Sequence, residues 1–168
     1  MRSAIRTILA ATSKGSGVDS GLNLVTMGGH PPETTPDPGC TMSFAHLTLA
    51  TRDAEATARF FEATMQWRRV HLPGNVELKA AWIEVAPGQQ IHILENPDYE
   101  ASNFEAEFGR HFAFFYPGSE FAALKERLVA HGAKVIAPIR PTPFERFFFR
   151  EANGYYFEII DRDTYVTE

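Results

Sequence analysis

The chain contains an internal repeat, and this repeat restricts its possible folds more than any other feature. At an offset of 65 residues, three pairs of residues align: His46 with His111, Glu55 with Glu120, and Val70 with Val135. With one further residue of offset, His92 aligns with Glu158. Self-similarity at a fixed offset is typical of a duplicated supersecondary unit. We therefore expect two copies of one module.

The first copy has the pattern β-α-β-β-β. Residues 44–50 alternate as in a strand, and Asp53 can cap a helix that extends to about residue 65. We expect Ala56, Phe60 and Ala63 to form the core-facing side of this helix. Three more strands are predicted at 68–72, 76–85 and 89–95.

The second copy repeats this order after a polar, acidic connection, residues 96–109. The pattern predicts a strand at 111–116, a helix capped by Ser119 that stops at Gly132, and strands at 134–137, 146–150 and 155–160. Three consecutive phenylalanines in the second of these strands, residues 147–149, are typical of a strand buried on both faces. Phe148 is therefore expected to pack in the core.

The expected fold class is α+β. Two tandem βαβββ modules, at about 43–95 and 110–161, are expected to form a cupped, pseudo-twofold mixed sheet with the helices on its convex face. The repeat-related candidates would then project from the concave face, because their immediate neighbours in each strand are apolar and would pack against the helices. The candidates are His46, His92, His111 and Glu158.

Three imidazoles and one carboxylate on one face suit a divalent transition ion. Zinc, nickel, cobalt, manganese and iron fit this donor set, whereas calcium and magnesium prefer oxygen ligands. Four further side chains are expected to line a substrate pocket beside the ion: Phe44, Gln90, Phe115 and Tyr156. Three arginines of the second module can either hold a carboxylate or phosphate or face solvent: Arg140, Arg146 and Arg150. The other histidines are interpreted as surface or turn residues: His30, His71 and His131.

Residues 1–41 differ from the rest in being rich in Gly, Ser, Thr and Pro, which predicts a disordered N-terminal tail before a domain at 42–168. A targeting segment is the alternative, since Arg2 and Arg6 occur there without an early acid. The net charge of −5 without a Lys/Arg cluster argues against a nucleic-acid partner, and the apolar runs are too short for a membrane span. Cys40 is the one cysteine, so no internal disulfide can form, and we expect a cytoplasmic protein.

Residues 44 to about 161 resemble the vicinal oxygen chelate superfamily, which includes glyoxalase I, methylmalonyl-CoA epimerase, fosfomycin-resistance enzymes and extradiol dioxygenases. The resemblance rests on His46 in the first strand, on His111 followed by Phe-Ala-Phe, and on Glu158 in the last strand. It implies that these three residues are metal ligands. His92 occupies the remaining ligand position, where glyoxalase I generally has Glu and the epimerase has Gln.

The resemblance implies a homodimeric, metal-dependent lyase or isomerase that acts on a small vicinal-oxygen substrate through an enediolate. Glu158 and His92 would act as catalytic bases. One alternative is an iron-dependent extradiol dioxygenase, which needs two histidines and one carboxylate but would be crowded by His92. A second is a non-catalytic, drug-sequestering protein, although such relatives commonly lack the ligands. A third is a resistance transferase, for which we find no cation- and phosphate-binding residues.

Overall fold

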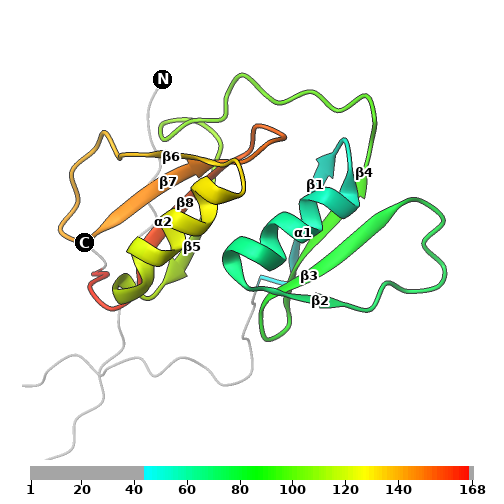
Figure 1. Cartoon of the computed structure of the whole chain (residues 1–168), viewed down its shortest axis with the longest axis horizontal. Helices are drawn as coiled ribbons and strands as arrows, with labels where there is room; N and C mark the ends of the chain where they lie inside the picture. Colours follow the sequence, from blue (N-terminus) through cyan, green and yellow to red (C-terminus); the bar gives the residue numbers. More distant parts are fainter. Residues whose placement is uncertain (1–43, 167–168) are drawn as a thin grey trace, which may run out of the picture. The chain divides into compact units, whose positions relative to one another are not determined.

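The computed structural model describes residues 44–166. The chain divides into two units, Met1–Thr41 and Met42–Glu168. The predicted tail at residues 1–41, with His30 and Cys40, therefore lies outside the described residues. Within the second unit, one strand, one helix and three strands follow each other twice along the chain (Figure 1).

The two modules have closely similar elements. The first contains β1 (His46–Thr51), α1 (Ala54–Met65), β2 (Arg68–Val70), β3 (Ala80–Ala86) and β4 (Gln89–Glu95). The second contains β5 (Phe112–Tyr116), a 3₁₀ turn η1 (Gly118–Glu120), α2 (Phe121–Ala130), β6 (Lys134–Ile136), β7 (Arg146–Arg150) and β8 (Tyr156–Asp161). Neither helix has the length and apolar run that a membrane span requires.

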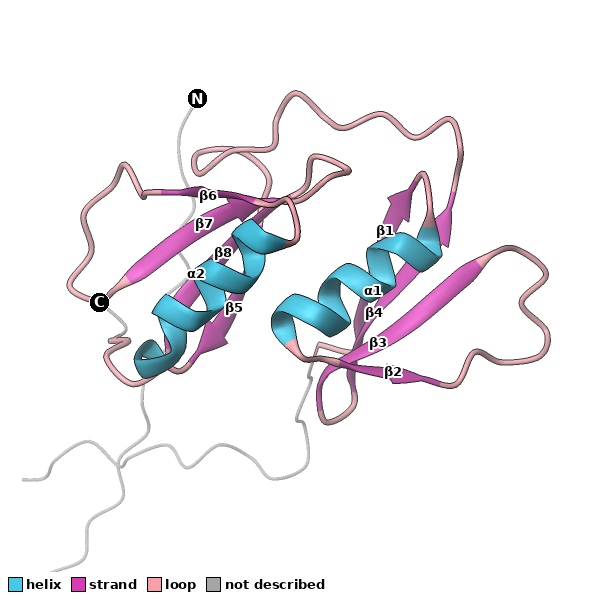
Figure 2. Cartoon of the chain, in the orientation of Figure 1, coloured by secondary structure: helices cyan, strands magenta, loops and turns pink. Residues whose placement is uncertain are grey.

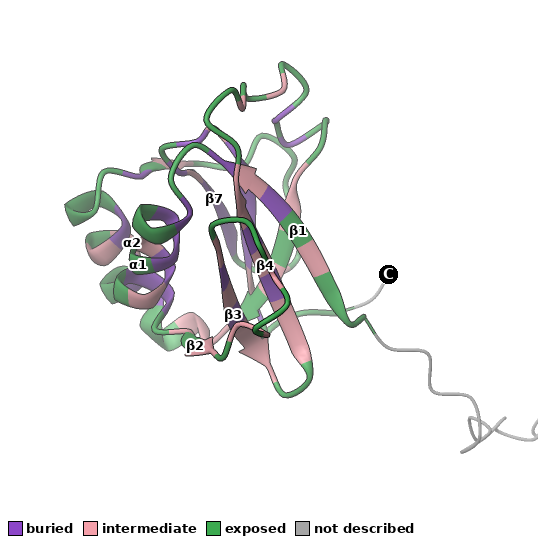
Figure 3. Ribbon diagram, turned by 90° about the vertical axis from the view of Figure 1, so that its right-hand side faces the viewer, coloured by how far each residue is buried: buried purple, intermediate pink, exposed green. Residues whose placement is uncertain are grey.

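The eight strands form two mixed sheets of four, with the orders β1-β4-β3-β2 and β5-β8-β7-β6. In each sheet the first and last strands of the module pair in parallel, and the other neighbours are antiparallel (Figure 2). Both helices lie on the same side of the sheets (Figure 3). The tandem βαβββ fold is thereby confirmed. In both sheets the module's first strand, β1 or β5, is an edge strand.

The helix starts differ from expectation in one module. Asp53 caps α1 as predicted, because its side chain accepts a bond of 2.8 Å from the backbone N–H of Ala56. The predicted cap at Ser119 is wrong, since this residue lies within η1 and α2 begins at Phe121 without a side-chain cap bond. The Asp161 carboxylate instead accepts a bond of 3.0 Å from the Gly118 backbone N–H.

The core-facing side of α1 also differs from expectation. Ala56 and Ala63 are exposed and Phe60 is half-buried. The buried side consists of Ala54, Thr57, Ala58, Phe61, Thr64 and Met65. The predicted stripe is therefore rotated by about one residue.

The two modules share one hydrophobic core. The ring of Phe61 on α1 meets the ring of Phe157 on β8 edge to face, with centroids 5.6 Å apart. Trp67 likewise contacts Phe114 of β5 at 4.9 Å. The Tyr155 hydroxyl donates to the Ala50 carbonyl at 2.9 Å and accepts from the Ala50 N–H at 3.0 Å. These contacts fix the second module against the first.

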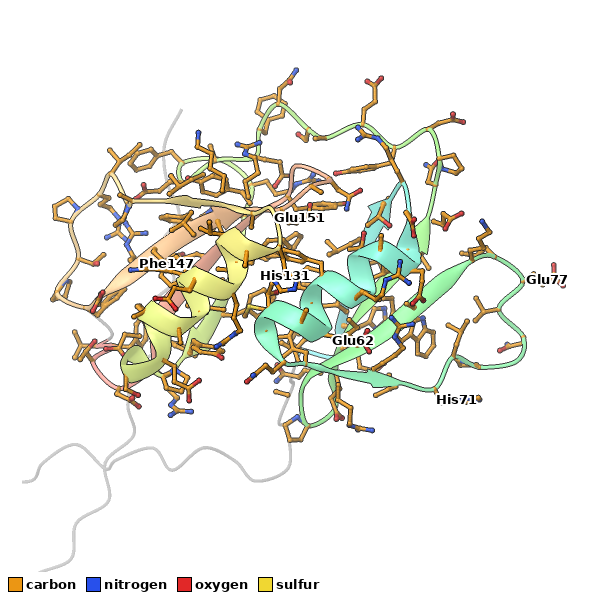
Figure 4. The ribbon with its side chains drawn as sticks, in the orientation of Figure 1. Glu62, His71, Glu77, His131, Phe147 and Glu151 are labelled. Atoms are coloured by element: carbon orange, nitrogen blue, oxygen red, sulfur yellow. The ribbon has the colours of Figure 1, made fainter. Side chains whose placement is uncertain are left out.

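A buried loop adds a polar link between the modules. Glu151, in the turn after β7 (Figure 4), accepts bonds from the side chain and backbone of Asn153 at 2.8 and 2.9 Å. The Asn153 amide also donates to the Thr57 hydroxyl of α1 at 3.0 Å. Burial raises the pKa of the Glu151 carboxyl above its ordinary value of 4.5, although these hydrogen bonds oppose the shift.

This raised pKa predicts a pH dependence of stability. The folded chain binds the Glu151 proton more tightly than the unfolded chain, so the stabilisation is full below pH 4.5 and is lost as the pH rises through the raised pKa. We expect the free energy of unfolding of the wild type, minus that of Glu151→Gln, to fall as the pH rises above 4.5. Urea unfolding at several pH values measures this difference, with the exposed Glu126→Gln as a matched loss of charge. A difference that rises with pH would contradict the assignment.

The connection between the modules has an inverted pattern of burial. Glu105 and Glu107 are buried, at 3% and 8% exposure, whereas Phe104 and Phe108 are 77% and 73% exposed. Glu105 accepts bonds from the Arg110 side chain at 2.6 Å and from the Tyr156 backbone N–H at 3.1 Å. The acidic side chains thus attach this segment to the second module.

Candidate functional site

The first sheet presents a stack of three rings on one face. His46 on β1, His92 on β4 and Trp82 on β3 share this face because the register pairs His92 with Trp82 and places His46 opposite Gln90. The His46 and His92 rings stack at 4.1 Å, and the Trp82 and His92 rings stack at 3.8 Å. The structure therefore brings two of the four predicted ligands together.

The Gln90 contact and burial determine the chemical state of His92. Its Nε2 lies 3.0 Å from the side-chain oxygen of Gln90, which can only accept, so Nε2 carries the proton and Nδ1 keeps a lone pair. Burial lowers the pKa of His92, and a charge on His46 lowers it further. His92 is consequently a neutral imidazole at neutral pH, the form that can accept a proton or bind a metal.

The second sheet presents His111 and Glu158 as a pair. His111 directly precedes β5, and Glu158 lies on the neighbouring strand β8. Nε2 of His111 lies 3.3 Å from Oε2 of Glu158, and the His111 ring stands edge-on against Phe148 at 5.6 Å. Two ligand atoms at about 2.1 Å from one ion lie about 3 Å apart when they are adjacent, so this spacing suits a transition metal. The buried Nδ1 of His111 has no hydrogen-bond partner among the described residues.

Arg146 and Glu107 extend the second pair into a buried row of charges. Arg146 on β7 donates from Nη1 to Oε1 of Glu158 at 2.6 Å and from Nη2 to Oε1 of Glu107 at 2.5 Å. Glu107 also accepts the backbone N–H groups of Ile139 and Arg140, at 2.5 and 3.0 Å. Burial alone would raise the pKa of Glu107, but the bonds from Ile139, Arg140 and Arg146 outweigh it and lower the pKa.

The four predicted ligands thus lie in two pairs, one on each sheet. Among residues 44–166, no three His, Cys, Asp or Glu side chains come together in a group that could hold a metal. Each pair stands at the edge-strand side of its sheet, because β1 carries His46 and β5 follows His111. The donors of each pair fit a transition metal chemically, and each pair supplies half of the predicted set.

The four residues predicted to line one substrate pocket lie in different places in the structure. Phe44 lines a cavity of 370 Å³ together with Leu47, Val85, Gln89 and residues 111–114, which include His111. Gln90 contacts His92 instead, and Phe115 is 55% exposed and packs against Tyr165. Tyr156 is buried beside Phe148 at 5.1 Å, and burial raises its pKa. Only Phe44 of the four lines this cavity.

The three predicted arginines and the other two described histidines either make structural contacts or are exposed. Arg146 lines a second cavity, of 350 Å³, with residues 138–142, 144 and 145, which include Arg140. Arg150 lies over the Tyr156 ring at 5.3 Å and donates to backbone carbonyls. His71 and His131 are exposed, as predicted (Figure 4).

Two residues of the site were not singled out from the sequence. Trp82 could have been found from the sequence. It lies between the apolar Ala81 and Ile83, so strand alternation places it on the face opposite the helices, which is also the face of His92. Glu107 carried no such signal, since it lies in an irregular, polar connection that suggested solvent exposure. Phe148 is fully buried as predicted, but it packs beneath His111 and Arg146 on the site face.

Comparisons with known proteins agree with the fold. The family model described as the Glyoxalase/Bleomycin resistance protein/Dioxygenase superfamily matches residues 43–159. A search of curated proteins found no match.

Solved structures share the architecture at low sequence identity. A fosfomycin resistance protein, FosX, from Listeria monocytogenes is 22% identical, with a TM-score of 0.58 over 71% of this chain and 90% of its own. FosX from Mesorhizobium loti is 20% identical, with a TM-score of 0.56 over the same shares of the two chains, 71% and 90%. A glyoxalase family protein from Bacillus anthracis is 19% identical, with a TM-score of 0.58 over 71% of this chain and 93% of its own.

Proposed function

Because the chain belongs to the Glyoxalase/Bleomycin resistance protein/Dioxygenase superfamily, we propose that it is a metal-dependent lyase or isomerase acting on a small molecule with two neighbouring oxygens. Membership confirms the resemblance drawn from His46, His111 and Glu158. The observation that carries the proposal is the pair of donor atoms on His111 and Glu158, 3.3 Å apart, with a second, repeat-related pair on the other sheet. A variant of the Listeria FosX, crystallised with Mn(II) and 1S,2S-dihydroxypropylphosphonic acid, supports a divalent ion in this fold.

We further propose that the two pairs meet between two copies of the chain. The contacts of Phe61 with Phe157 and of Tyr155 with Ala50 hold the two modules in place, so the pairs are not free to approach each other within one chain. His46 and His92 of one copy would therefore join His111 and Glu158 of the other. A twofold homodimer has two equivalent sites of this kind.

In this site His46, His111 and Glu158 would hold the ion, and His92 would act as the base. A divalent transition ion, when bound, would polarise a substrate carbonyl and acidify the neighbouring C–H. His92 is neutral, keeps a free lone pair on Nδ1, and can take that proton and return it to the adjacent carbon. Glu158 would have to give up Arg146 to act as a base, so its geometry supports a fixed ligand.

The apolar cavity beside His111 supports a small substrate. Its volume of 370 Å³ suits a compact molecule, and Phe44 and His111 are among the residues that line it. Thiol adducts of 2-oxoaldehydes, which carry two neighbouring oxygens, are the candidate substrates.

Elemental analysis of the purified protein tests the proposal. We expect one transition ion per chain in the wild type and in the exposed-histidine control His71→Ala, and loss of the ion in His111→Ala and Glu158→Ala. Wild-type protein that retains no ion, and takes none up from zinc, nickel, cobalt, manganese or iron, would contradict it. Iron alone, with cleavage of a catechol ring, would favour the dioxygenase instead.

Mixing two defective chains tests the shared site. His46→Ala retains the His111 and Glu158 pair, and Glu158→Ala retains the histidine pair, so a mixed dimer has one intact site. After subunit exchange, we expect metal binding to return at about a quarter of the wild-type sites. If the site lies within one chain, mixing restores nothing.

A further inference from the structure

Arg146 makes an unusual contact for a residue beside a metal ligand. Its side chain is 3% exposed and lies between two carboxylates, with Nη1 on Glu158 and Nη2 on both Glu107 and the Arg140 carbonyl. Its guanidinium also lies 5.1 Å from the centre of the Phe148 ring. Three hydrogen bonds and this ring fix the guanidinium in place, so it has no freedom to turn away from Glu158.

The contact distinguishes the two oxygens of Glu158. Oε1 accepts the Arg146 bond of 2.6 Å, whereas Oε2 faces Nε2 of His111 at 3.3 Å. A carboxylate whose second oxygen is already hydrogen-bonded binds an ion through the remaining oxygen. An ion beside His111 can therefore bind Oε2 without displacing Arg146.

The charge of Glu107 explains how a cation can remain so close to a metal ligand. A lone guanidinium beside Glu158 would repel an incoming ion and neutralise the carboxylate. Glu107 carries the opposite charge on the other side of Arg146 at 2.5 Å, so the pair of Glu107 and Arg146 is neutral as a unit. Glu158 thereby keeps its own negative charge for the ion.

We propose that Arg146, held by Glu107, is a positioning residue that presents Oε2 of Glu158 as a single-oxygen metal ligand beside His111. The inference rests on the proposed function, because it assigns the metal to this pair. Outer groups that orient metal ligands typically change metal affinity by about 10–100-fold when they are removed.

Cobalt(II) binding to the metal-free, full-length protein tests the role of Arg146. Affinity is measured by competition with a coloured chelator, and circular dichroism checks that each variant is folded. We expect Arg146→Met to bind cobalt about 10–100-fold more weakly than the wild type. Arg146→Lys should recover part of this loss, since one ammonium can reach a single carboxylate but lacks the planar fork that joins two.

The second arginine of the strand provides a matched control. Arg150 has the same charge, lies on β7 and packs on Tyr156, but donates only to backbone carbonyls. Arg150→Met should therefore leave cobalt affinity unchanged. Glu107→Gln should weaken binding in the same direction as Arg146→Met, whereas Glu105→Gln, at a buried carboxylate bound to Arg110, should not.

The visible spectrum of bound cobalt provides a readout that general destabilisation would not change. Cobalt(II) absorbs more weakly as its coordination number rises. Without Arg146, the freed Oε1 of Glu158 can also reach the ion, so absorption per bound cobalt should fall in Arg146→Met and stay at the wild-type level in Arg150→Met.

The outcomes separate the two proposals. Wild-type protein that takes up no cobalt removes the metal site and this inference with it. If the wild type binds cobalt and Arg146→Met binds it equally well or more tightly, Arg146 competes with the ion and only the positioning role is overturned. Should Arg146→Met fail to fold, Arg146→Lys and Glu107→Gln decide by the same criteria.

Discussion

Replacing Phe157 by alanine is expected to lower the free energy of unfolding by about 3–5 kcal/mol. Phe157 is fully buried, and its ring meets Phe61 of the first module as well as Phe149 and Phe112 of the second. Its removal leaves a cavity where the modules join, and neither sheet can close it by a local shift. Guanidinium unfolding followed by circular dichroism measures the loss.

An exposed phenylalanine serves as the control for this change. Phe104 is 77% exposed, so Phe104→Ala should change the free energy of unfolding by less than about 0.5 kcal/mol. Equal losses in the two variants would mean that the shared core does not join the modules as described. The loss expected for Phe157→Ala is a large part of the roughly 5–15 kcal/mol that stabilises a typical domain.

Replacing His92 by alanine is expected to lower turnover by about 10²–10⁴-fold while the ion remains bound. The measurement is steady-state turnover of whichever proposed substrate the wild type converts, with elemental analysis of the same sample. His71→Ala should retain wild-type turnover because His71 is exposed and lies outside both pairs. Loss of the ion from His92→Ala would instead make His92 a fourth ligand, as the repeat first suggested.

The pH profile of the wild type should agree with this role. Burial, followed by the neighbouring His46 charge, lowers the pKa of His92 from its ordinary value of 6.5. A base acts in its neutral form, so kcat/KM should rise with pH through a pKa below 6.5 and be level at neutral pH. A midpoint above 6.5 would count against His92 as the base.

Strand periodicity correctly predicted which side chains lie on each face of the sheets. Successive side chains point to opposite sides, so Ile91 and Ile93 had to be buried if His92 faced the site, and both are fully buried. The strand at 76–85 was predicted too long, and the structure begins it at Ala80.

Helix periodicity was less reliable, because polar residues can be buried when their hydroxyls are satisfied locally. Thr57 and Thr64 on α1 donate to the carbonyls four residues earlier, at 2.8 and 2.7 Å. Their side chains therefore pack in the core at little cost. A prediction that treats threonine as polar therefore assigns Ala56 and Ala63, which are exposed, to the buried side of the helix.

The repeat alignment identified the residues of the candidate site but not their partners. Equivalent positions in two modules follow from the sequence, whereas the pairing of His46 with His92 and of His111 with Glu158 depends on strand order. The contact of Arg146 with Glu107 depends on the path of an irregular segment, for which no periodicity exists.

The connection between the modules tolerates little change in length. Connections of polar composition are usually the places where insertions and deletions are accepted. In this one, Glu105 and Glu107 point inward while Phe104 and Phe108 point outward. Removing one residue between Phe104 and Glu107 would shift Phe108 into the position where the Arg146 guanidinium needs a carboxylate, and adding one would shift Ala106 there. Natural variation in length should therefore accumulate at other loops, and a grafted tag or sensor belongs elsewhere in the chain.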